Sequence, residues 1–228
     1  MVVSQPRPSI QPPHRILVVD DHPLFRAGLV GLMSHESDLD VCGEAHNAAQ
    51  ALDAIKLLNP DLAIVDIGLP DKNGLELLKD IQALHPGVDV LIISMHAESL
   101  YAERVLRAGA SGYVMKQEAT EKVIIALRQI FSGSIYLSDK LSARLMHQLV
   151  GGGRAVSTGL VVDQLSDREL EVFGLIGQGR GTRQIAEQLH LSVKTIESHR
   201  AHIKEKLSLN SATELVHRAV QMRSEQAF

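Results

Sequence analysis

The chain has 228 residues, of which 45% are hydrophobic, 22% are charged and 3% are aromatic, and its formal net charge is −4. This composition excludes fibrous and wholly disordered proteins, and the length suffices for one large or two modest domains. The single thiol, Cys42, cannot form an internal disulfide, and no apolar run reaches the roughly 18 residues of a membrane-spanning helix. We therefore expect a cytoplasmic protein that does not enter a membrane.

The charge is unevenly divided along the chain. Residues 1–150 contain 13 Lys/Arg and 18 Asp/Glu, a net charge of −5, whereas residues 151–228 contain 10 and 9, a net charge of +1. Basic residues are concentrated between Gly179 and Lys206, where six of them stand against three acidic residues. Nucleic acid is therefore a candidate partner for the carboxyl-terminal part.

The first part of the chain has the pattern of an α/β protein. Residues 1–13 are Pro-rich and lack the basic start and apolar stretch of a signal peptide, so we expect a disordered tail. Thereafter apolar segments of strand length alternate with segments that place apolar residues at helical spacing. The predicted strands are 15–20, 39–45, 62–66, 89–94 and 112–115. This alternation predicts a five-stranded, doubly wound parallel sheet over residues 14–133.

The pattern changes after Gly133. We expect a linker over 134–164 that contains a helix over 138–150 and then a Gly-rich stretch without helical periodicity. Residues 165–228 contain four amphipathic segments, each preceded by a residue suited to a helix start. The second domain is therefore predicted to be all-α, with four helices.

Acidic residues follow two of the predicted strands. Asp20 and Asp21 close the first strand and Asp66 closes the third, and the ends of parallel strands lie at one edge of the sheet. Crowded carboxylates repel unless a cation neutralises them, and an all-oxygen cluster suits Mg²⁺. Ser94 and Lys116 add a hydroxyl and a positive charge at the same edge. Together these groups predict a site for phosphoryl transfer.

Four segments of this domain resemble the receiver domain of bacterial two-component response regulators. They are VVDDHPLFRAGL, AIVDIGLPDKNGLELL, IISMH and RAGASGYVMK, and the resemblance extends from about Arg15 to Gly133. It implies a flavodoxin-like fold in which Asp66 accepts a phosphoryl group from a sensor histidine kinase. It also implies that Asp21 binds Mg²⁺ directly, Asp20 binds it through water, and Asp66 and the backbone carbonyl of Gly68 complete the protein ligands.

The same resemblance assigns a switch to the last two strands. It implies that Ser94 hydrogen-bonds the phosphoryl group, that Lys116 pairs with it, and that Tyr113 turns inward when Ser94 shifts. An ordinary strand aromatic is the alternative interpretation of Tyr113. Bulky Met95 after Ser94 departs from the small residue frequent in receivers, which leaves the dephosphorylation rate open.

The carboxyl-terminal domain contains a helix-turn-helix by spacing. Two helices join at a short turn over His190–Ser192, and the second helix leaves a polar, basic surface outside its apolar set, as a helix in the major groove requires. Residues from about Leu165 to Gln221 resemble the LuxR-type DNA-binding domain. With the receiver, this resemblance indicates the NarL/FixJ subfamily.

The LuxR-type resemblance implies a set of DNA contacts. Base edges are expected at Glu197, Ser198 and Ala201, and Thr182 is a candidate phosphate contact or a plain helix cap. The residues expected nearer the DNA backbone are Lys194, Thr195, Arg200 and Lys204. The last helix is expected to expose Leu215, Val216 and Val220 for pairing of DNA-bound subunits, with packing inside its own domain as the alternative.

We therefore expect a non-enzymatic transcription regulator. Phosphorylation of Asp66 is expected to release the helix-turn-helix domain, which then forms a homodimer on double-stranded promoter DNA. Two other functions compete with this interpretation. One is a regulator that acts without phosphorylation. The other is a Mg²⁺-dependent aspartyl-phosphate phosphohydrolase, which is disfavoured because Gly68 stands where that chemistry places a second acid.

Overall fold

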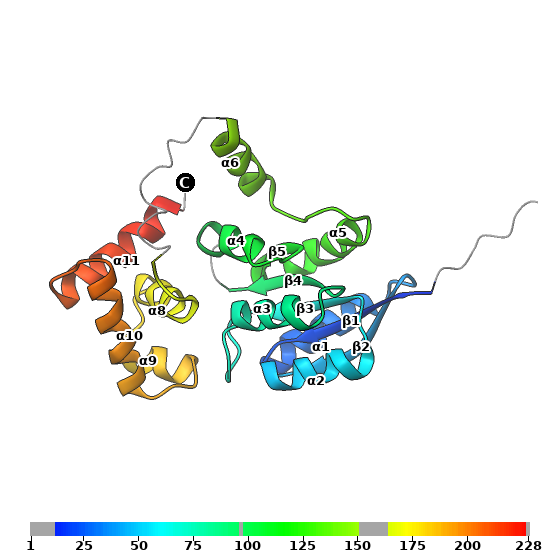
Figure 1. Ribbon diagram of the computed structural model, residues 1–228, viewed down its shortest axis with the longest axis horizontal. Coiled ribbons are helices and arrows are strands. Elements are labelled where there is room, and N and C mark those ends of the chain that lie inside the picture. Colours follow the sequence, from blue (N-terminus) through cyan, green and yellow to red (C-terminus); the bar gives the residue numbers. More distant parts are fainter. Residues whose placement is uncertain (1–11, 96–97, 151–163, 227–228) are drawn as a thin grey trace, which may run out of the picture.

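The computed structural model describes residues 12–95, 98–150 and 164–226, arranged as an α/β domain followed by a helical domain (Figure 1). The strands form one parallel sheet of order β2-β1-β3-β4-β5, which confirms the predicted topology. They are β1 His14–Val19, β2 Leu39–Ala45, β3 Leu62–Asp66, β4 Asp89–Ser94 and β5 Gly112–Met115. The helices of the sheet domain are α1 Pro23–Met33, α2 Ala48–Leu58, α3 Gly74–Leu84, α4 Glu98–Arg107, the 3-10 helix η1 Lys116–Glu118 and α5 Ala119–Phe131.

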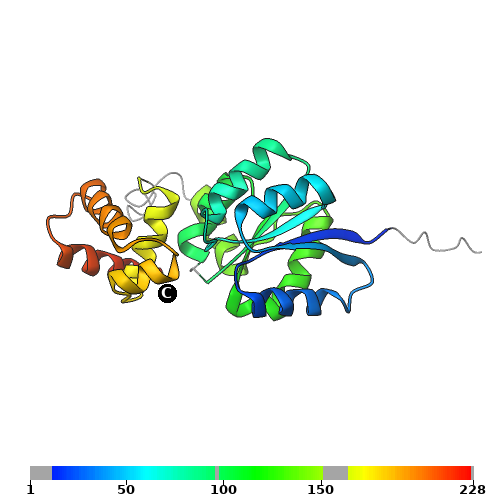
Figure 2. The same ribbon diagram turned by 90° about the horizontal axis from the view of Figure 1, so that it is seen from below.

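The sheet is covered on both faces (Figure 2). On one face, buried residues such as Ile16 and Val18 of β1 pack with α1 and α5. On the other face, Leu17 and Val19 pack with α2, α3 and α4. Because the central strands are buried on both sides, they are continuously apolar, as the sequence shows. The strand order places the ends of β1 and β3 side by side.

The loop after β3 is fixed by two residues. A Cβ on Gly74 would lie 2.1 Å from the backbone oxygen of Asp66, so this position accepts only glycine without a shift of the backbone. Asp71 accepts hydrogen bonds from the backbone N–H groups of Ala48 and Ala49, at 2.9 and 3.1 Å, and so ties the loop to the start of α2. These contacts hold the loop against the acidic edge of the sheet.

A further helix, α6 Asp139–Val150, follows the sheet domain. The Gly-rich stretch that we expect to be a linker lies almost entirely outside the described residues. The helices of the second domain are α8 Asp167–Gly177, α9 Thr182–Gln188, α10 Val193–Lys206 and α11 Ala212–Gln226. The predicted four-helix domain is therefore confirmed.

Local signals explain where these helices begin. Ser166 and Glu169 form a reciprocal capping box at the start of α8, and the hydroxyl of Ser192 accepts a hydrogen bond from Thr195 N–H at the start of α10. Between α9 and α10, His190 adopts a positive φ of 52°, which closes the short turn. The start of α10, the second helix of the predicted helix-turn-helix, is thus fixed by its cap, and the turn before it is closed at His190.

Candidate functional site

The acidic residues predicted from the sequence lie together at the carboxyl end of the sheet. Asp20 follows β1 and Asp66 ends β3, with residue exposures of 2% and 4%. Asp20, Asp21, His22 and Asp66 each place one candidate ligand atom within 4.8 Å of the others. This donor set of three carboxylates and an imidazole fits a divalent cation.

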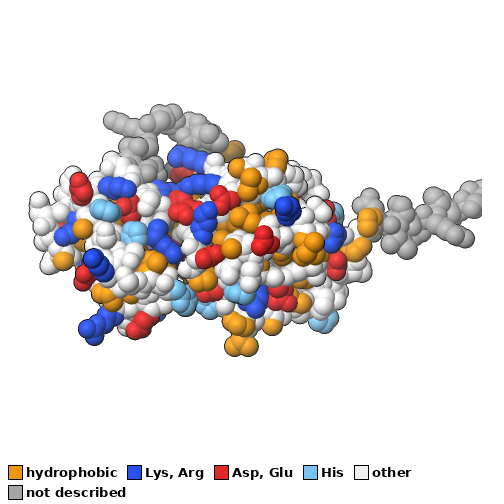
Figure 3. Space-filling view, turned by 60° about the horizontal axis from the view of Figure 1, so that its bottom comes forward, with side chains coloured by type: hydrophobic (Ala, Val, Ile, Leu, Met, Phe, Trp, Pro, Cys, Tyr) orange, Lys and Arg blue, Asp and Glu red, His pale blue; other side chains and the backbone are white. Residues whose placement is uncertain are grey.

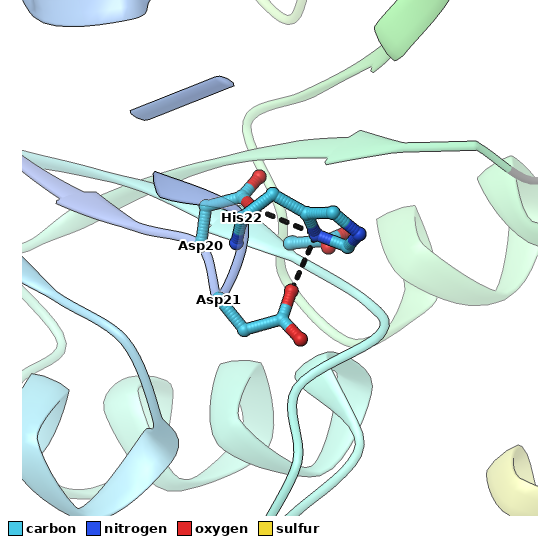
Figure 4. Close-up of side chains that lie close together, drawn as sticks. Asp20, Asp21 and His22 are labelled. Carbon is cyan, nitrogen blue, oxygen red and sulfur yellow. Dashed lines mark hydrogen bonds and ion pairs between the residues drawn. The ribbon is translucent and has the colours of Figure 1, made fainter. Parts of the chain in front are cut away.

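His22 is a member of this cluster that the sequence analysis did not single out. Its Nδ1 lies 2.5 Å from Oδ1 of Asp21 and 3.3 Å from Oδ1 of Asp20, as the dashed lines of Figure 4 show. Its position directly after the two aspartates was the available signal. The imidazole shields part of the mutual repulsion of these carboxylates when it is protonated.

Lys116 bridges the two buried carboxylates. Its Nζ lies 2.7 Å from Oδ2 of Asp20 and 2.7 Å from Oδ2 of Asp66, and its side chain is 5% exposed. The ammonium also lies 4.7 Å from the ring centre of Phe25, within range of a cation–π interaction. η1 begins at Lys116 directly after β5, and this position places the fixed positive charge beside Asp66.

The buried charges perturb one another. Burial, opposed by Lys116 and reinforced by Asp20, raises the pKa of Asp66 to about 6. Burial disfavours the charged ammonium of Lys116, but the carboxylates of Asp66 and Asp20 outweigh that effect and raise its pKa. Without a further cation, the positive charge of Lys116 therefore neutralises only part of the negative charge of Asp20 and Asp66.

Ser94 and Tyr113 form a buried pair beside this cluster. Ser94, at the end of β4, is 0% exposed, Tyr113 of β5 is 1% exposed, and their hydroxyl groups are hydrogen-bonded. Burial raises the pKa of Tyr113, so the phenol stays protonated. Gly68 donates a backbone hydrogen bond to the carboxylate of Asp66, and Met95 is 55% exposed at the rim.

The second domain presents the surface expected to contact DNA. On α10 the three residues expected at base edges, Glu197, Ser198 and Ala201, are all exposed. The residues expected near the DNA backbone are exposed or partly exposed, namely Lys194, Thr195, Arg200, Lys204 and, at the start of α9, Thr182. This face is therefore accessible in the described arrangement.

The expectation for α11 needs one correction. Leu215 is 0% exposed and belongs to the apolar core shared by the helices of this domain, so it does not form part of an outer surface. Val216 and Val220, the other two residues named for subunit pairing, are 40% and 43% exposed. A periodicity of 3.6 residues places Leu215 on the face toward α8 and Val216 on the face away from it.

An acidic, lysine-bridged site on a doubly wound sheet, joined to a helix-turn-helix domain, defines a DNA-binding regulator with a phosphoacceptor domain. Comparison with protein families agrees: residues 16–128 match the response regulator receiver domain, and residues 163–219 match the bacterial regulatory proteins of the luxR family. In the described residues, no helix is both long and apolar enough to cross a membrane.

Whole-chain comparisons extend this match. The chain is 35% identical to the oxygen regulatory protein NreC of Staphylococcus carnosus over 92% of this chain and 98% of that one, and 33% identical to NreC of Staphylococcus epidermidis with the same coverage. Among solved structures, the chain is similar to RcsB of Salmonella enterica serovar Typhimurium bound to promoter P1flhDC in the presence of the phosphomimetic BeF3⁻. The identity is 25% and the TM-score is 0.61, over 90% of this chain and 98% of that one. A LuxR-family two-component response regulator from Aurantimonas sp. is 30% identical, with a TM-score of 0.56, over 60% of this chain and 99% of that one.

The chain therefore belongs to the response regulators of the NarL/FixJ subfamily, which join a receiver domain to a LuxR-type DNA-binding domain.

Proposed function

We propose that Asp66 accepts a phosphoryl group from a sensor histidine kinase in the cytoplasm and that this reaction controls binding of the chain to promoter DNA. The observation that carries the proposal is the buried bridge from Lys116 to Asp66 and Asp20, which places a fixed cation 2.7 Å from the carboxylate. Phosphoryl transfer depends mainly on positioning and on positive charge around the transferred group.

The covalent step is a displacement at phosphorus. A carboxylate oxygen of Asp66 forms the new P–O bond while the P–N bond to the histidine of the kinase breaks, and the released imidazole takes up a proton. Lys116 stabilises the negative charge on the phosphoryl oxygens, and the hydroxyl of Ser94 donates a hydrogen bond to one of them. Tyr113 then follows the movement of Ser94, because their hydroxyl groups are already hydrogen-bonded.

Mg²⁺ is the cation that this donor set fits best, because hard carboxylate oxygens predominate. Asp20, Asp21, Asp66 and the backbone carbonyl of Gly68 would hold it. When bound, Mg²⁺ neutralises charge on the transferred group and on the crowded carboxylates. Burial is the main cause of the raised pKa of Asp66, and a cation bound beside this carboxylate would favour its charged form.

The output is dimeric binding to DNA. Glu197, Ser198 and Ala201 of α10 read base edges in the major groove, and the neighbouring basic residues contact phosphates. Val216 and Val220 of α11 supply the exposed apolar surface through which two DNA-bound domains pair. Because the second domain has a net charge of only +1, pairing on two half-sites supplies much of the useful affinity.

The test uses the full chain with beryllofluoride and Mg²⁺ as a stable mimic of the phosphorylated state. Wild type is expected to change from monomer to dimer in light scattering and to protect two half-sites in a DNA footprint. Asp66→Asn is expected to remain monomeric. A dimer mass that is the same in both variants, with and without beryllofluoride, would instead support regulation without phosphorylation.

A further inference from the structure

The first helix of the DNA-binding domain is seated on the receiver. Nζ of Lys79 on α3 lies 2.6 Å from Oδ2 of Asp167, and Nη1 of Arg104 on α4 donates to the backbone oxygen of Leu165 at 2.8 Å and to Oδ1 of Asp167 at 3.2 Å. Acidic and basic side chains gather along this junction in Figure 3. The amino-terminal turn of α8 is thus tethered to α3 and α4 by charged hydrogen bonds.

One turn further along α8, Glu171 carries a carboxylate into this junction. The residue is 0% exposed. Its Oε2 accepts hydrogen bonds from Nδ2 of Asn73 on the receiver, at 2.9 Å, and from Nη1 of Arg168, at 2.7 Å. Burial of a carboxylate between two domains is costly unless it is paired, so these two donors stabilise the seated arrangement.

Oε1 of Glu171 points toward the phosphoacceptor. It lies 3.9 Å from the position that a Cβ would take on Gly68, and Oδ2 of Asp66 lies 3.7 Å from the same position. Gly68 has no side chain that could stand between the carboxylates of Asp66 and Glu171. Oδ2 of Asp66 and Oε1 of Glu171 are therefore about 8 Å apart or closer. At this distance two negative charges repel appreciably when they are buried away from water.

We propose that Glu171 is a charge sensor that makes phosphorylation of Asp66 and seating of α8 on the receiver mutually unfavourable. This inference rests on the proposed phosphorylation of Asp66. At constant metal occupancy, the phosphoryl group replaces one carboxylate charge by about two phosphate charges, and it extends the charged group outward from the end of β3. The added charge repels Glu171 and so weakens its contact with the receiver, and α8 separates from the receiver.

The exposed α10 surface shows what this release changes. Glu197, Ser198 and Ala201 are exposed while α8 is seated, so the contact with the receiver does not cover the base-reading residues. Release of α8 instead frees the whole domain to reorient and to pair with a second copy. The coupling is reciprocal, so removal of the Glu171 charge also strengthens binding of a phosphoryl mimic.

The test compares Glu171→Gln with wild type in the full chain. Gln keeps an oxygen that accepts the hydrogen bond from Asn73 but removes the charge. Glu205→Gln is the matched control, because Glu205 lies in the same domain and is exposed. Bound beryllofluoride is followed by fluorine NMR in Mg²⁺, and the distance between domains is followed by spin labels at Ala83→Cys and Gln188→Cys in a Cys42→Ser background.

In wild type and in Glu205→Gln, beryllofluoride is expected to lengthen the distance between the labels. In Glu171→Gln the labels are expected to stay close, and the half-saturating beryllofluoride concentration is expected to fall by about tenfold. Glu171→Asp, which restores the charge, is expected to regain opening. If Glu171→Gln opens like wild type with an unchanged half-saturating concentration, the charge-sensor proposal is wrong.

Two further outcomes distinguish a failure of the charge-sensor proposal from a failure of the proposed phosphorylation of Asp66 or of folding. If wild type itself binds no beryllofluoride, the proposed phosphorylation of Asp66 fails, and the sensor fails with it. If circular dichroism shows that Glu171→Gln does not fold, Glu171→Ser is judged by the same two measurements, since it also removes the charge and retains a polar group.

Discussion

Replacement of Asp66 by Asn is expected to stabilise the receiver at neutral pH when no divalent cation is present. Burial and the neighbouring Asp20 raise the pKa of Asp66 to about 6 from an ordinary value of 3.8. The folded protein therefore holds a proton on Asp66 in a pH range in which the unfolded chain has lost it. Asn has a similar shape, needs no proton, and keeps an oxygen that Lys116 can donate to.

The sign and size of the effect follow from linkage between proton binding and folding. Between about pH 4 and pH 6 the native state binds more protons at this group than the unfolded state, so the free energy of unfolding falls as pH rises. A difference of about 2 pKa units corresponds to about 3 kcal/mol, since each unit is worth about 1.4 kcal/mol. Below the unfolded pKa this contribution is fully present, and above the folded pKa it is lost.

The assay is urea unfolding from pH 4 to pH 8 in the presence of a chelator. The free energy of unfolding of wild type is expected to fall by about 3 kcal/mol across that pH range because Asp66 loses its proton. The pH profile of Asp66→Asn is expected to lack this fall. At pH 7.5 the variant should be more stable than wild type by an amount of this order, and added Mg²⁺ should stabilise wild type more than the variant. Parallel pH profiles, or a variant less stable than wild type at pH 7.5, would refute the reasoning.

Two further predictions concern packing. Gly74→Ala would place a Cβ 2.1 Å from the backbone oxygen of Asp66, so we expect a loss of about 1–3 kcal/mol in urea unfolding together with weaker beryllofluoride binding; unchanged values would show that the loop yields easily. Leu215→Ala removes a fully buried side chain and is expected to cost about 2–5 kcal/mol. Val216→Ala, at a residue 40% exposed, is expected to cost about 0.5 kcal/mol or less while it weakens pairing on DNA. Equal losses of stability at the two positions would contradict the assignment of Leu215 to the core.

Much of the receiver followed from local patterns. The second, third, fourth and fifth strands lie where they were predicted, at 39–45, 62–66, 89–94 and 112–115. The pattern is clearest in the central strands, because buried parallel strands are almost continuously apolar. Asp20, Asp66 and Lys116 were expected at one edge because the carboxyl ends of parallel strands lie at the same edge of the sheet. The start at Ser192 was expected, and for α8 the sequence offered Ser166 or Asp167. In the structure the hydroxyl groups of Ser166 and Ser192 cap the first turn of their helices.

The sequence was less informative where a residue can face either of two surfaces. The apolar pattern of α11 left open whether Leu215 packs inside its domain or pairs with another copy, because both faces of this helix carry apolar residues. His22 was passed over, since its 2.5 Å contact with Asp21 depends on how the chain turns after β1.

The sequence by itself determined the two fold classes, the parallel sheet and the acidic residues at its edge, because these depend on periodicity and on residues that directly follow strands. Only the tertiary structure decided that Glu171 of the second domain lies beside Gly68 and Asp66 of the first. These residues are about 100 positions apart and are joined by no sequence pattern. Contacts between separately folded domains arise from the shapes and charges of finished surfaces, and such surfaces exist only after each domain has folded.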